Sequence, residues 1–335
     1  MSDRIPLPPL VFAPLLKRIR WGGRKLGNVL GKPIGDESDY AESWEVADQD
    51  GNESRVASGR LAGISLPELI ATAGESLLGT QVGMNQFPLL IKYLDANDWL
   101  SLQVHPNDFL ARQYGSRERG KTECWVILQA DPGAKICCGL KRGVTTEQLQ
   151  TGLEVAVSDP SSHLLEDLLH IYPVEAGDCV FVPAGTIHAL GPGILLAEIQ
   201  QQSNLTFRLY DWGKLGSDGQ PRPVHIQESL TCTDFARGPV FPVVAQQLCD
   251  QEHGFEELVR CEYFVVRRHT SLHPFSLLSD GRFRILMTLA GSGTVDTSTG
   301  AEALVLGGTV LLPACCERIR VRPGERLQIL EITCP

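Results

Sequence analysis

Four side chains in two separated segments of this chain have the types and spacing of a metal site. Gln103 and His105 lie in the first segment together with Glu123, and His188 ends the second. Two imidazoles, one carboxylate and one amide oxygen form a mixed nitrogen and oxygen set that suits zinc or a similar divalent cation. The first expectation is therefore a metal centre held by these four residues.

The spacing of these residues indicates how β-structure would position them. Gln103 and His105 are two residues apart, so on a strand both side chains point to the same face, and Pro106 ends that strand. Glu123 opens an apolar run, and His188 follows a Pro-Ala-Gly turn whose glycine permits a tight bend. Each residue alone is more often structural or exposed, but the combination is rare and favours a site in the mouth of a small β-barrel.

The composition predicts a globular protein rich in short strands. The chain has 335 residues, 43% of them hydrophobic and 21% charged, which is enough for two domains or one large one. Its 33 glycines and 21 prolines favour turns and short strands over long helices. A net charge of -10 without a basic cluster argues against nucleic acid and anionic membranes as partners.

The same sequence favours a cytoplasmic location. The N-terminus lacks the apolar core of a signal peptide, and no later stretch is long enough to span a bilayer. The 10 cysteines include no Cys-x-x-Cys motif, which agrees with reduced thiols in a cytosol. Nothing in the sequence indicates the oligomeric state.

The chain divides into two β-rich regions. Residues 1–220 contain the candidate ligands, N-terminal strands and a helical insert at about 138–172, and residues 221–335 are again strand-like. Helix starts are predicted after Ser65 and Thr145, which can cap the following residues. Gly213–Pro223, rich in glycine and proline, is the candidate linker.

The second region is a weak repeat of the first. When the two regions are aligned, Arg284 takes the place of Glu123, and Arg318 that of His188. A cation cannot ligate a cation, so we expect the second copy to keep the barrel and to lack the metal. This predicts one metal ion per chain.

Several motifs together resemble the cupin superfamily and, more narrowly, the short bacterial form of the type I phosphomannose isomerases. They are Leu102–Pro106, Gly120–Trp125, Val182–Leu190, Ala197–Gln201 and Phe207–Trp212. The resemblance covers residues 8 to 330 in layout and is specific between about 88 and 212. It implies a mainly β fold of two cupin-type jelly-roll barrels, with the helical insert in the first.

The resemblance also implies a set of site residues. Zinc would be held by Gln103, His105, Glu123 and His188, and Arg208 would be the active-site arginine. Lys92 and Lys121 fall where the family has pocket lysines, and Glu198 where it has a pocket carboxylate. The chain departs from the family pattern at Asn204, where many relatives have an acid, and at Leu190, where larger relatives have a tyrosine.

The implied reaction is the interconversion of mannose 6-phosphate and fructose 6-phosphate through an enediol, which needs a base, an electrophile and a phosphate anchor. Arg208 alternates with Thr206 on a strand, so it can point inward, and its fixed charge suits an enediolate or a phosphate. Lys121 and Glu198 both remain candidates for the base. The alternatives are a non-enzymatic sugar-binding or sensor protein on the same barrel and, with less support, a cupin metal oxygenase.

Overall fold

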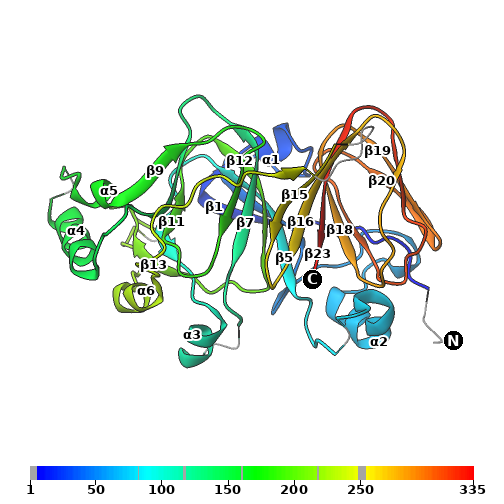
Figure 1. Ribbon diagram of the computed structural model, residues 1–335, viewed down its shortest axis with the longest axis horizontal. Coiled ribbons are helices and arrows are strands. Elements are labelled where there is room, and N and C mark those ends of the chain that lie inside the picture. Colours follow the sequence, from blue (N-terminus) through cyan, green and yellow to red (C-terminus); the bar gives the residue numbers. More distant parts are fainter. Residues whose placement is uncertain (1–5, 82, 116–117, 160, 217–218, 248–253) are drawn as a thin grey trace.

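The computed structural model describes residues 6–81, 83–115, 118–159, 161–216, 219–247 and 254–335. Strands dominate it, as predicted from the composition, and the short helices lie at the edges (Figure 1). Four large sheets follow one another along the long axis of the molecule (Figure 1), and a separate two-stranded sheet pairs β3 (Asp48–Gln49) with β4 (Asn52–Glu53). Among the described residues, no helix is long and apolar enough to cross a membrane.

The first two sheets come from the first region of the chain. The six-stranded sheet has the order β1 (Leu15–Gly23), β2 (Tyr40–Val46), β5 (Leu89–Ala96), β12 (Ile194–Gln201), β7 (Glu123–Ala130) and β10 (Cys179–Val182). The five-stranded sheet has the order β13 (Phe207–Tyr210), β6 (Leu102–Val104), β11 (His188–Leu190), β8 (Lys135–Leu140) and β9 (Leu169–Pro173). Trp125 and Leu196 of the first sheet pack with Ile136 and Leu190 of the second, so the two sheets face each other.

The other two sheets come from the second region. The six-stranded sheet has the order β14 (Gln246–Gln247), β15 (Gly254–Arg260), β16 (Val265–Ser271), β23 (Leu327–Thr333), β18 (Arg284–Ala290) and β21 (Thr309–Leu312). The four-stranded sheet has the order β17 (Phe275–Ser276), β22 (Arg320–Pro323), β19 (Gly293–Thr297) and β20 (Gly300–Leu304). Leu286 and Ile329 pack against Val295 and Val321 between these two sheets.

The largest hydrophobic core lies between the two six-stranded sheets. Val126 and Ile199 of the first belong to the same buried cluster as Ile285 and Ile332 of the second. The N-terminal segment also joins the two regions, because Leu10 pairs with Leu311 of β21. The predicted boundary after residue 220 and the closure of each sheet pair into a barrel stay predictions.

The register of the strands supports the predicted repeat. In the first region Val182 pairs with Glu123, and in the second Leu312 pairs with Arg284, as the sequence alignment requires. Arg284 is 1% exposed and its Nε donates to Glu331 Oε1 at 2.7 Å. The position of a candidate ligand in the first region is thus occupied by a buried ion pair in the second.

The helices confirm two predicted caps and lie outside the sheets. They are α1 (Lys25–Asn28), α2 (Leu66–Leu78), α3 (Asp108–Gln113), α4 (Thr146–Ser158), α5 (Leu164–Leu168) and α6 (Ile226–Cys232). Capping boxes at Ser65 and Thr145 begin α2 and α4. The helix that begins after Ser65 continues to Leu78, and Ala73 marks a kink inside it. The predicted insert at 138–172 contains α4 and α5, and its two ends belong to strands β8 and β9.

Candidate active site

Three of the predicted ligands meet in the interior of the first sheet pair. Glu123 Oε2 lies 3.5 Å from His105 Nε2, and Glu123 Oε1 lies 3.4 Å from His188 Nε2. One potential ligand atom from each residue lies within 4.8 Å of the others, and all three side chains are buried. The group can therefore hold a metal ion.

Two facing sheets position these side chains. Glu123 begins β7 in the six-stranded sheet, whereas His188 begins β11 in the five-stranded sheet. Gln103 of β6 pairs directly with His188, and its Nε2 lies 3.2 Å from His188 Nε2. Rotation of the Gln103 amide by 180° brings its oxygen to the same point, where it can act as a fourth ligand.

The hydrogen bonds of both histidines fit a cation. His105 Nδ1 donates to the Leu205 carbonyl at 3.0 Å, and His188 Nδ1 donates to the Thr186 carbonyl at 2.8 Å. Because Nδ1 carries the hydrogen in each ring, each Nε2 presents a lone pair toward Glu123. His105 Nε2 is buried without a hydrogen-bond partner among the described residues, which is the arrangement that a bound cation would satisfy.

The electrostatics keep the ligand atoms free of protons. Burial, together with the nearby Lys121 ammonium, lowers the pKa of His105 to about 3, and burial also lowers the pKa of His188. Burial alone would raise the pKa of Glu123, but the charge of Lys121 and the adjacent histidines hold that pKa well below its usual value. Neutral imidazoles and an ionised carboxylate are the forms that bind divalent metals.

A second buried charge cluster lies beside the ligands. Lys92 Nζ is 3.1 Å from Glu198 Oε2 and 3.4 Å from Glu42 Oε2, and Trp125 Nε1 donates to Glu198 Oε1 at 3.2 Å. Burial would lower the pKa of Lys92, but the two carboxylates raise it above its usual value. Lys121 Nζ lies 3.0 Å from Glu123 Oε2 and thus joins this cluster to the candidate metal ligands.

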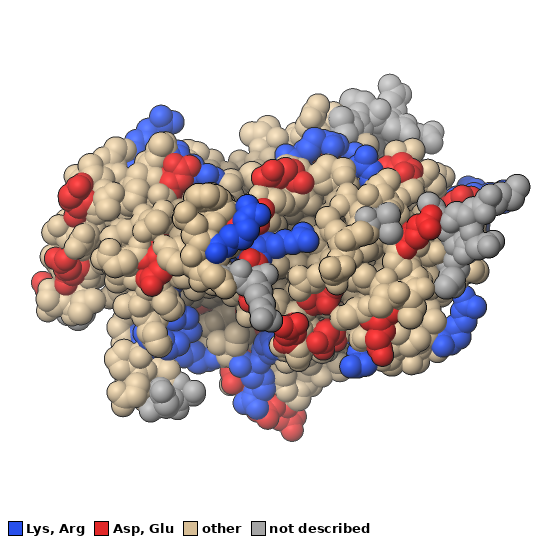
Figure 2. All heavy atoms as spheres, turned by 90° about the horizontal axis from the view of Figure 1, so that it is seen from below, with Lys and Arg blue, Asp and Glu red and all other residues tan. Residues whose placement is uncertain are grey.

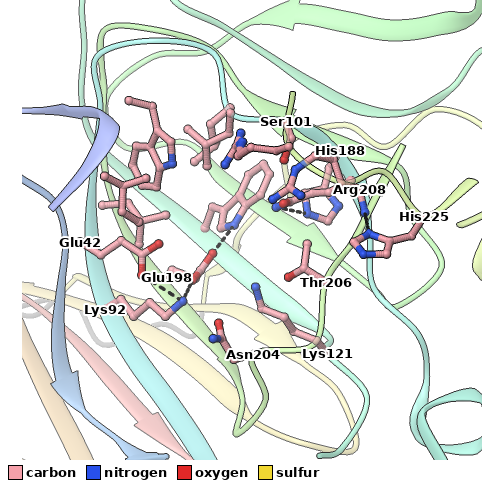
Figure 3. Close-up of a pocket in the computed structure, with 18 residues that line it drawn as sticks. Glu42, Lys92, Ser101, Lys121, His188, Glu198, Asn204, Thr206, Arg208 and His225 are labelled. Atoms are coloured by element: carbon pink, nitrogen blue, oxygen red, sulfur yellow. Dashed lines mark hydrogen bonds and ion pairs between the residues drawn. The ribbon is translucent and has the colours of Figure 1, made fainter. Parts of the chain in front are cut away.

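The candidate metal ligands and the charge cluster lie at one cavity of about 350 Å³ (Figure 3). Gln103, His188, Lys92, Lys121, Glu198 and Arg208 are all in its wall, and His105 and Glu123 lie directly behind it through the contacts above. Figure 3 shows Glu42, Lys92 and Glu198 on one side and Arg208 and His225 on the other. The structure therefore brings all eight predicted site residues together.

Other pocket residues were not singled out from the sequence. Ser101, Trp125 and Thr206 each lie two positions from a predicted site residue, so the same strand alternation could have identified them. Glu42 alternates with Trp44 on β2 but is not part of a recognisable motif. Arg222 lies in the predicted linker and His225 comes just after it, in irregular backbone where no periodicity fixes the direction of a side chain.

The two departures from the family pattern also lie in the pocket. Leu190 is 1% exposed and Asn204 lies on the exposed rim, and both belong to the lining. At Leu190 the wall is apolar, and at Asn204 it carries an amide instead of a charge.

Comparison with known proteins places this geometry in a family. The catalytic-domain model of the type I phosphomannose isomerases matches residues 11–120. The mannose-6-phosphate isomerase of Streptococcus mutans is 33% identical over 307 residues, which is 91% of this chain and 92% of that protein. Mannose-6-phosphate isomerase ManA of Bacillus subtilis is also 33% identical, over 91% of this chain and 93% of that protein.

A solved structure agrees with the sequence comparison. The crystal structure of a mannose 6-phosphate isomerase from Bacillus subtilis superimposes with a TM-score of 0.88 at 28% identity, covering 97% of this chain and 99% of that one. The fold is thus the cupin fold of those enzymes. With a third of its residues identical over nine-tenths of its length, the chain belongs to the type I phosphomannose isomerase family, whose members are aldose–ketose isomerases.

Proposed function

We propose that this chain interconverts mannose 6-phosphate and fructose 6-phosphate, with one zinc ion held by Gln103, His105, Glu123 and His188. The observation that supports this function most directly is the convergence of His105, Glu123 and His188 with Lys121 and Glu198 at one cavity. A metal site, a paired carboxylate and an ammonium group are the parts that an aldose–ketose isomerase needs.

The proposed reaction moves one proton between carbons and one between oxygens. A base removes the proton from C2 of the open-chain aldose, the C1 carbonyl oxygen gains a proton, and a cis-enediol forms. The O2 proton is then lost and the first proton is delivered to C1, which leaves the carbonyl at C2. When bound, zinc would act as a Lewis acid that polarises the sugar oxygens and favours loss of the C–H proton.

We assign the role of the base, which moves the carbon-bound proton from C2 to C1, to Glu198. Its carboxylate is held by Lys92 and by the Trp125 N–H, and it is 4% exposed inside the cavity. Lys121 is paired with Glu123 and in that state is a proton donor, which suits the sugar oxygens. Lys92 and Arg208 are assigned to substrate binding, and the charge of Arg208 suits an anion.

A coupled assay with mannose 6-phosphate tests the function. The purified chain loaded with zinc is expected to form fructose 6-phosphate, and a chelator is expected to abolish turnover until zinc is restored. Metal analysis should give one zinc per chain, and His188→Ala should lower that content. Absence of conversion by the metal-loaded chain would overturn the proposal and favour a sugar-binding or sensor protein, while bound iron with oxygen consumption would favour an oxygenase.

A further inference from the structure

The end of the cavity opposite Glu42 is built partly from the segment predicted as a linker. Residues 222–225 return to β13, where the His225 N–H donates to the Arg208 carbonyl at 2.7 Å. The Arg208 N–H donates to His225 Nδ1 at 3.2 Å, and Arg208 Nη1 donates to the Pro223 carbonyl at 2.8 Å. This segment therefore fixes both the backbone and the guanidinium group of Arg208.

Positive charge exceeds negative charge at this end. Arg222 pairs with Asp211 through Nε at 2.6 Å and through Nη2, and Arg20 Nη2 lies 3.5 Å from the same carboxylate. Burial lowers the pKa of Arg208, and the positive charge of Arg222 lowers it further. Asp211 is thus the acidic partner of both Arg222 and Arg20, and Arg208 has no ion pair among the described residues, which leaves two positive charges to be balanced.

Several donors at this end lack an acceptor within the described part of the chain. Arg208 Nε is buried without a hydrogen-bond partner, and the pairing of Arg222 with Asp211 leaves its Nη1 unused. His225 Nδ1 accepts a backbone hydrogen bond, so in the neutral ring Nε2 carries the hydrogen and is a donor. Hydroxyl groups of Ser101 and Thr206 lie in the same wall.

We propose that Arg222 is a specificity determinant that, together with Arg208 and the His225 Nε2–H, binds the phosphate group of the substrate. This rests on the proposed function. A phosphate monoester carries nearly two negative charges at neutral pH and three acceptor oxygens, which matches the two uncompensated charges and the unused donors. A neutral sugar would leave these charges unpaired, so Arg222 selects phosphorylated sugars.

The test compares Arg222→Gln with the wild-type chain, both loaded with zinc. We expect the KM for mannose 6-phosphate and the inhibition constant for inorganic phosphate to rise at least tenfold, with kcat changed less than threefold. Arg222→Lys keeps a charge but loses the two-pronged geometry, and it should restore part of the affinity. Arg18→Gln removes an arginine that is likewise paired with acids, but outside the cavity, and should leave both constants unchanged.

Three outcomes would overturn the assignment or separate it from the function. If Arg222→Gln binds phosphate and substrate within twofold of the wild type, Arg222 does not hold the phosphate. If that variant fails to fold, Arg222→Lys decides, since an unchanged inhibition constant contradicts the proposal. If the wild-type chain does not isomerise mannose 6-phosphate, calorimetry with inorganic phosphate still tests Arg222: binding that is lost in Arg222→Gln supports its role, and absence of binding to the wild type refutes it.

Discussion

At the scale of single residues, the two acid–base candidates differ in how they are held. Glu198 accepts from Trp125 and pairs with Lys92, whereas Lys121 pairs with Glu123. Both lie in the same cavity, yet one is positioned as a carboxylate and the other as an ammonium. Opposite charge states in one pocket allow one group to accept a carbon-bound proton while the other donates to oxygen.

Glu198→Gln is therefore expected to lose turnover by a factor of about 10²–10⁴, because that is what a general base contributes to the rate. Zinc content should stay at the wild-type level, since Glu198 is not a proposed ligand. The measurement is exchange of the substrate C2 proton with deuterated solvent, followed by NMR. Exchange at the wild-type rate in Glu198→Gln, together with its loss in Lys121→Gln, would move the base role to Lys121.

The buried ammonium of Lys92 is expected to stabilise the folded chain strongly. Its side chain is 4% exposed between Glu42 and Glu198, so Lys92→Met leaves the buried Glu198 and the partly buried Glu42 without their counter-charge. Removal of one partner from a buried pair costs about 3–5 kcal/mol of unfolding free energy, measurable by urea denaturation. Lys25→Met is a matched control, because Lys25 pairs with the half-exposed Asp131 and such a pair contributes about 1 kcal/mol or less. Equal losses in both variants would contradict this explanation.

At the scale of elements, strand periodicity explains which parts of the site can be predicted from the sequence. Gln103 and His105, and likewise Thr206 and Arg208, share a face because strand side chains alternate. The alternation fails after Arg208, where a register shift turns Tyr210 away, so that its hydroxyl donates to the Ala156 carbonyl of α4. Arg222 lies in irregular backbone with no period, so its place in the pocket follows only from tertiary contacts.

The end of α2 offers a prediction at the same scale, because it contacts the second region closely. Gly79 has a φ of +58°, and a Cβ there would lie 1.9 Å from the Gly281 carbonyl oxygen. Gly79→Ala should thus separate α2 from the second region and lower the unfolding free energy by about 2 kcal/mol or more. Gly63→Ala is the control. The φ of Gly63 is +83° and no atom lies within 4 Å of a Cβ added there, so the only cost of this variant is the backbone strain of about 1–2 kcal/mol. A smaller loss for Gly79→Ala than for Gly63→Ala in urea unfolding would contradict the contact.

At the scale of the whole molecule, charge is distributed without a dominant patch on the face seen from below. Figure 2 shows Lys and Arg side chains interspersed with Asp and Glu there. The arginines at one end of the cavity are thus a local feature within a chain of net charge -10, which is how a protein of this overall charge can bind an anion.

The packing of the two six-stranded sheets predicts that the first region does not fold alone. Val240 and Val243 still hydrogen-bond to β8 and β10, so a fragment that retains all contacts of the first sheet pair extends to residue 243. In such a fragment the outer face of the first six-stranded sheet, including Val126 and Ile199, would lose its cover of Ile285 and Ile332. Large exposed apolar faces cause aggregation.

Residues 1–243 expressed alone are therefore expected to be insoluble or to lack a cooperative unfolding transition by circular dichroism, whereas the full chain unfolds cooperatively. Co-expression with residues 244–335 should restore solubility because it restores the shared core. A soluble, zinc-binding fragment with isomerase activity would show instead that the second region is dispensable for both folding and catalysis.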